Sequence, residues 1–107
     1  MLESNYQAGL ITRIRQRFDD DCIILKNDPN YLQGIPDLLV IFKDKWAMLE
    51  VKTGPKASHQ PNQDYYVQLA NEWSFASFIY PENEEEVLNE LERALQPRRE
   101  ARLHWSK

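Results

Sequence analysis

The sequence has few cysteines and histidines, the residues that form disulfides or bind soft metals in small domains. Its one cysteine, Cys22, excludes an internal disulfide, and its position in the apolar run CIIL predicts a buried core thiol in a reducing compartment. The two histidines, His59 and His104, have no partner at metal-ligand spacing, which favours surface positions. No apolar stretch is long enough for a signal peptide or a membrane span, so we expect a cytoplasmic protein without a membrane partner.

A length of 107 residues suits one small domain, and a hydrophobic fraction of 42% is enough to form a core. Charge is distributed unevenly. Residues 97–107 carry four basic residues and one glutamate, a net +3, so the remainder of the net −4 chain sums to −7. We therefore expect a folded domain over residues 1–96 and a basic C-terminal tail over residues 97–107. DNA binding is compatible with this total if the local basic spots share one face, with modest and salt-sensitive affinity.

Apolar spacing predicts an alternation of helices and strands. Residues 2–18 place an apolar side chain at every fourth position, which is typical of an amphipathic helix. Short apolar runs predict strands over residues 22–26, 36–42, 46–52 and 75–80, with a tight turn at KDK between the second and third. Helical patterns cover residues 63–73 and 83–95. This order predicts an α/β fold: a mixed central sheet flanked by helices on both faces.

Charged residues interrupt the predicted hairpin GIPDLLVIFKDKWAMLEVK. Side chains alternate along a strand, so Glu50 and Lys52 point the same way, and Asp37 lies about as far from the turn as Glu50 does. All three should meet at one end of the hairpin. Neighbouring carboxylates repel each other, and a hard divalent cation such as Mg²⁺ relieves the repulsion and can activate water at a phosphate. A lysine beside them can hold that water or the phosphate.

A simpler interpretation is that Glu50 and Lys52 form a surface ion pair and that Asp37 is a turn residue after proline. The context favours a site, because both acids lie in or at the mouth of apolar runs, where an unpaired charge is costly.

GIPD followed thirteen residues later by EVK resembles the PD-(D/E)XK nuclease superfamily, and most closely its VRR-NUC and archaeal-type Holliday junction resolvase groups. The resemblance extends from about residue 3 to residue 95. It implies a restriction-endonuclease-like αβββαβ core. It also implies that Asp37 and Glu50 bind Mg²⁺ or Mn²⁺ together with the carbonyl of Val51, and that Lys52 positions the attacking water.

The resemblance extends to two further positions. Family members often carry a glutamate on the first helix, which here is Glu3; a favourable charge at a helix N-terminus is the alternative. A glutamine on the helix after the lysine strand is also common. Gln63 is favoured for that role and Gln60 is the fallback, and either could instead be an ordinary polar residue at a helix start.

The implied activity is that of a metal-dependent DNA endonuclease. The substrate is expected to be a Holliday junction or other branched DNA, in phage or mobile-element replication or repair, inside a bacterial or phage-infected cell. A homodimer is expected because one chain carries one site. The alternatives are a nicking or exonucleolytic nuclease on single-stranded or damaged DNA, and a non-catalytic nucleic-acid-binding module. The residues expected to contact DNA are Arg13, Arg17, Gly34, Lys56, Arg98, Arg99 and Arg102.

Overall fold

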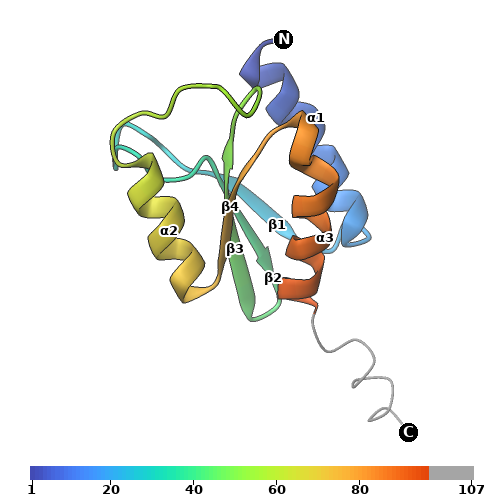
Figure 1. Ribbon diagram of the computed structural model, residues 1–107. Helices are drawn as coiled ribbons and strands as arrows, with labels where there is room; N and C mark the ends of the chain where they lie inside the picture. The colour runs from blue at the N-terminus through green and yellow to red at the C-terminus, as the bar shows by residue number, and fades with distance from the viewer. Residues whose placement is uncertain (97–107) are drawn as a thin grey trace, which may run out of the picture.

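The computed structural model describes residues 1–96, which form an α/β fold (Figure 1). The tail predicted over residues 97–107, with Arg98, Arg99 and Arg102, lies outside the described residues. Within residues 1–96, no helix combines the length and the apolar character needed to cross a membrane. The elements are α1 (Glu3–Arg17), β1 (Ile23–Lys26), β2 (Leu38–Phe42), β3 (Lys45–Val51), α2 (Gln63–Trp73), β4 (Phe75–Ile79), a short 3₁₀ turn (Pro81–Asn83) and α3 (Glu84–Leu95).

The strands of the described chain form one mixed sheet in the order β1-β2-β3-β4. β1, β2 and β3 are antiparallel neighbours, and β4 joins β3 in parallel after the crossover through α2. The two-residue turn between β2 and β3 places Lys43 in the left-handed region, at φ 57°. The predicted mixed sheet with helices on both faces is confirmed, and the predicted elements end within two residues of the observed ones.

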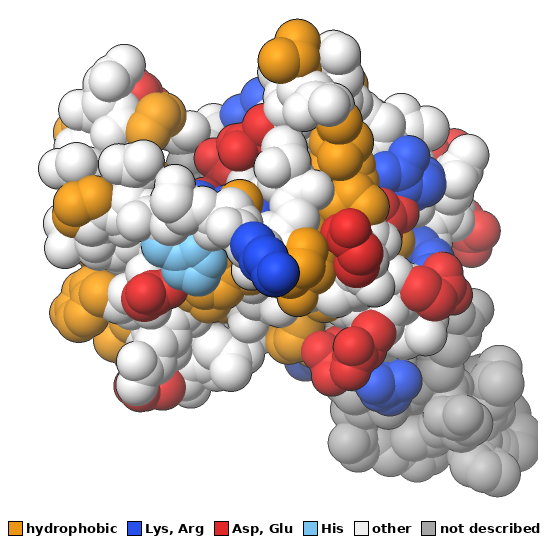
Figure 2. Space-filling view, turned by 45° about the horizontal axis from the view of Figure 1, so that its top comes forward, with side chains coloured by type: hydrophobic (Ala, Val, Ile, Leu, Met, Phe, Trp, Pro, Cys, Tyr) orange, Lys and Arg blue, Asp and Glu red, His pale blue; other side chains and the backbone are white. Residues whose placement is uncertain are grey.

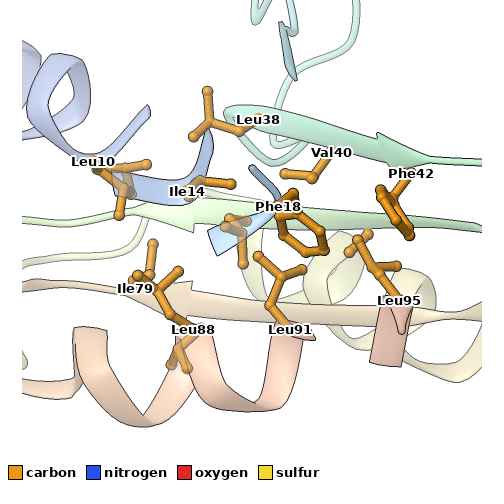
Figure 3. Close-up of a cluster of buried hydrophobic side chains, with 14 of the residues drawn as sticks. Leu10, Ile14, Phe18, Leu38, Val40, Phe42, Ile79, Leu88, Leu91 and Leu95 are labelled. Atoms are coloured by element: carbon orange, nitrogen blue, oxygen red, sulfur yellow. The ribbon is translucent and has the colours of Figure 1, made fainter. Parts of the chain in front are cut away.

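One face of the sheet packs against α1 and α3 and forms the main hydrophobic core (Figure 3). Leu10 and Ile14 of α1 and Leu91 of α3 are fully buried there, as are Leu38 and Leu49 of the central strands. The four-residue spacing of α1 and the two-residue alternation of β2 and β3 direct these side chains to the same layer.

The other face carries α2, which packs against β3 and β4, with Val67 and Ala70 of the helix against Ala76 of β4. Two residues pack differently from what their apolar character suggests. Trp73 is 70% exposed, because it lies on the side of α2 with Tyr66 and not on the side of Val67 and Ala70, which meets the sheet. Cys22, expected to be fully buried, is only half-buried at the edge of the main core.

Candidate active site

Two carboxylates lie side by side where β2 begins and β3 ends. The pairing of Leu38 with Leu49, continued by one residue, places Asp37 opposite Glu50 on the α2 side of the sheet. An Asp37 side-chain oxygen accepts a hydrogen bond of 2.9 Å from the Val51 backbone N–H. Glu50 is only 2% exposed, so its carboxyl group is held inside the protein.

Burial changes the acidity of both carboxyl groups. It raises the pKa of Glu50 to about 8, and the negative charge of Asp37 adds to the rise while Lys52 opposes it. Burial also raises the pKa of Asp37, against the opposing effects of the Val51 N–H and Lys52. Two acids that resist ionisation beside each other form a site that favours a proton or a cation.

Lys52 completes the cluster from the end of β3. Its ammonium group is buried and donates hydrogen bonds to the Ser58 carbonyl at 3.0 Å and to Gln63 Oε1 at 2.7 Å, and it lies 3.8 Å from Glu50 Oε2. Gln63, the first residue of α2, also donates from Nε2 to Glu50 Oε2 at 2.8 Å. One amide therefore ties the lysine to the acid and fixes the geometry of both.

Of the two glutamines considered from the sequence, only Gln63 brings its side chain into the cluster. Gln60 is exposed and contributes its backbone N–H, which donates to Gln63 Oε1 at 2.7 Å. Glu3 begins α1 near the same site: its pKa is raised by partial burial and by the charge of Asp37, and lowered by Lys52. In Figure 2, acidic side chains lie in the upper middle part of the visible surface, above the histidine drawn in pale blue.

The cluster suits a hard divalent cation. Glu50 Oε1 is buried and has no hydrogen-bond partner among residues 1–96, so a cation or a proton shared with Asp37 would satisfy it. The Val51 N–H points at Asp37, and the carbonyl of a strand residue projects from the same edge as its N–H. Residues 1–96 contain no group of three or more His, Cys, Asp or Glu side chains placed to hold a metal. Two carboxylates, a carbonyl and waters are nevertheless a donor set that Mg²⁺ uses.

Gly34 lies beside the site, where it lines a hollow together with Gln60 and Gln63. It is buried at φ +92°, and a Cβ there would lie 2.5 Å from Cβ of Asn62, the residue before α2. The sequence analysis places Gly34 among the residues that contact DNA, and in the structure its close neighbour is Asn62 of the same chain. Contact between Gly34 and Asn62 holds the loop before β2 against the start of α2, where Gln63 lies.

We predict that Gly34→Ala destabilises the protein by about 2 kcal/mol or more, because alanine is strained at this φ and overlaps Asn62. Gly54→Ala is the matched control, since a Cβ at Gly54 meets nothing within 4 Å; it should change stability by less than about 0.5 kcal/mol. Urea unfolding measures both. Equal stability of the two variants would contradict the bracing role.

The two arginines of α1 that are expected to contact DNA have acidic partners. Arg13 donates to Glu84 of α3 at 3.0 Å, and Arg17 donates to Glu92 at 2.6 Å. Arg13 also lies ten residues, or roughly 15 Å, along α1 from Glu3. Phosphate contact by either arginine would require exchange of these ion pairs. Lys56 is exposed in the loop after Lys52, with no ion pair among the described residues.

The loop contacts that hold Lys52 in place were not predicted from the sequence. The Ser58 carbonyl is a backbone group, which no side-chain pattern predicts. His59, interpreted as a surface residue, is exposed but stacks on Phe78 with ring centroids 4.3 Å apart, and its Nδ1 lies 2.7 Å from Asp64 Oδ1. These contacts fix the loop over the site.

Comparison of the chain with family models, with curated proteins and with solved structures finds no match.

Proposed function

We propose that this protein is a metal-dependent DNA endonuclease, with Asp37, Glu50 and Lys52 as its catalytic group. One observation carries the proposal: the buried carboxyl group of Glu50 and the half-buried carboxyl group of Asp37, both with raised pKa values, lie beside the buried Lys52, and Glu50 Oε1 has no hydrogen-bond partner within residues 1–96 other than a proton shared with Asp37. A purely structural ion pair would need one acid for one lysine. The second acid, once ionised, destabilises the fold unless a cation binds.

The PD-(D/E)XK superfamily, in its VRR-NUC or Holliday junction resolvase form, is the family that we propose. The order α1-β1-β2-β3-α2-β4 matches the αβββαβ core that the motif implies, and the motif residues lie on the hairpin where that core would require them. The glutamate of α1 and the first glutamine of α2 lie near the same cluster. These agreements support the assignment together, because each comes from a different segment.

The proposed division of labour follows from the contacts. Asp37 and Glu50, with the Val51 carbonyl, would hold Mg²⁺ or Mn²⁺. When bound, the cation lowers the pKa of a coordinated water and stabilises negative charge on phosphate. Lys52 has three donors, of which two are directed at Ser58 and Gln63, which leaves one for the attacking water or a phosphate oxygen. Through its hydrogen bonds to both groups, Gln63 would fix the distance between Lys52 and Glu50 during the reaction.

The test is cleavage of end-labelled DNA by the purified full chain, with Mg²⁺, Mn²⁺ or EDTA. The substrates are a four-way junction, a flap, a linear duplex and a single strand. We expect cleavage with either metal and none in EDTA, with preference for branched DNA. Preference for linear ends or single strands would instead support the exonucleolytic or nicking alternative. Metal-independent binding by folded protein with no cleavage would refute the nuclease and favour a binding module.

A further inference from the structure

The hollow beside Gly34 adjoins the candidate active site. Its volume of about 450 Å³ falls within the range of roughly 300–1,000 Å³ that small-ligand sites occupy. It lies between the loop before β2 and the loop that leads into α2. Gln63 lines it, and the same side chain contacts both Lys52 and Glu50. A ligand in this hollow would therefore be separated from the carboxylate cluster by one glutamine.

The side chains around the hollow carry amide groups and no charge. The residues that line it, which we call the amide hollow, are Pro29, Asn30, Gln33, Gly34, Gln60 and Gln63. Asn30 and Gln60 form hydrogen bonds through their backbone N–H groups, but their side-chain amides and that of Gln33 have no partner among residues 1–96. Each amide offers both a donor and an acceptor. Three amides are thus available to a ligand.

The walls of the amide hollow are held in place without a ligand. Asn27 Nδ2 donates to the Pro36 carbonyl at 2.8 Å, across the base of the loop before β2. Within that loop, Asp28 Oδ1 accepts from the Asn30 backbone N–H at 2.8 Å. The contact of Gly34 with the residue before α2 joins this loop to the opposite wall. A ligand would therefore bind at a low cost in loop ordering.

An uncharged lining of amides suits a nucleobase better than a phosphate. Phosphate groups are held mainly by arginine, lysine or clustered backbone N–H groups, and no charged side chain lines the amide hollow. Asparagine and glutamine, in contrast, pair with the donor and acceptor atoms of base edges. Bases inside a duplex are stacked and paired, so a base that enters a hollow of this kind must be unpaired.

Tyr31 supplies an aromatic ring in the same loop. It lies between Asn30 and Gln33 in the sequence and is 89% exposed, so its ring is accessible to a ligand. Proteins that bind unpaired bases combine aromatic rings, on which the bases stack, with polar groups that pair with the base edges. The loop before β2 provides both.

We infer that the amide hollow binds an unpaired base of the DNA substrate beside the scissile phosphate, which rests on the proposed function for its choice of DNA. Asn30 and Gln33 pair with the edge of the base, and Tyr31 stacks on it. A flap or a single strand supplies such a base, whereas a linear duplex does so only by opening a base pair. The hollow therefore selects DNA with an unpaired nucleotide at the cleavage site.

Fluorescence anisotropy of the full chain with labelled flap DNA in EDTA tests this site without any need for cleavage. A second flap is identical except that the nucleotides of its unpaired arm are abasic. The unaltered protein should bind the abasic flap about 10-fold or more weakly, because the stacking and pairing contacts are lost. A variant that combines Asn30→Ala, Tyr31→Ala and Gln33→Ala should bind the two flaps within about twofold of each other.

Gln68→Ala is the matched control. It removes an exposed amide of α2 that does not line the amide hollow, so this variant should distinguish the two flaps as the unaltered protein does. Circular dichroism melts show whether the triple variant is folded. If it is not, Gln33→Ala alone decides, and it should narrow the difference between the flaps by about threefold or more.

Equal affinity of the unaltered protein for the two flaps overturns the base site and leaves the proposed cleavage intact. A folded triple variant that still distinguishes the flaps also overturns it, as does loss of the distinction in Gln68→Ala. Discrimination between the flaps by a protein that cleaves no DNA with Mg²⁺ or Mn²⁺ supports the base site and counts against the proposed chemistry alone. A folded chain that binds neither flap contradicts both.

Discussion

Replacement of Lys52 by alanine is expected to lower the single-turnover rate of DNA cleavage by about 10²–10⁴-fold while leaving DNA affinity largely intact. The ammonium group is buried between Glu50, Gln63 and the Ser58 carbonyl, and it has one donor left for substrate. No other lysine among the described residues has this set of contacts. A rate change without an affinity change is the signature of a group that acts on the reacting atoms.

Two companion variants separate chemistry from folding. Lys52→Met keeps the apolar stem but removes the charge, and it should be as inactive as Lys52→Ala. Lys45→Ala changes a lysine at the other end of β3, beside the turn, and should cleave at the unaltered rate. Gel shifts in EDTA and thermal melts accompany the kinetics. Full activity of a folded Lys52→Ala protein would remove the proposed mechanism.

Metal-free protein is expected to lose stability as pH rises from about 5 to about 8. The pKa of Glu50 is raised from 4.5 in the unfolded chain to about 8 in the folded one. Between these values the folded protein binds a proton that the unfolded chain has released, so the free energy of unfolding falls as pH increases. It is highest below the unfolded pKa and levels off above the folded one. The loss should be on the order of several kcal/mol.

Glu50→Gln should flatten this dependence and make the metal-free protein more stable at pH 8, since a neutral amide oxygen can still accept from Gln63. Urea unfolding at pH 5, 6.5 and 8 in EDTA measures the effect, with Glu86→Gln as the control because Glu86 is exposed on α3. A slope that persists unchanged in Glu50→Gln would exclude Glu50 as its source.

Thermal melts with and without Mg²⁺ test cation binding without reference to cleavage. Mg²⁺ requires ionised carboxylates, so it should raise the melting temperature of the unaltered protein more at pH 8 than at pH 6. Glu50→Gln should lose this response. An equal Mg²⁺ response in both proteins would place the cation elsewhere.

The sequence by itself determined where the charges of the hairpin would meet. Strand side chains alternate with a period of two and the turn is short, so Asp37, Glu50 and Lys52 were constrained to one end by local spacing. The helices and the mixed sheet followed from the same kind of periodicity, because each pattern spans enough residues to identify its element.

Only the tertiary structure decided which groups the side chains of each helix and strand contact. The choice between Gln63 and Gln60 depended on how the loop after Lys52 folds back over the site. The ion pairs of Arg13 and Arg17 depended on α3, more than seventy residues along the chain. The exposure of Trp73 depended on which side of α2 meets the sheet. Local spacing fixes the direction of a side chain from its own element, but the groups that it contacts come from distant segments, whose positions follow from the packing of the whole domain.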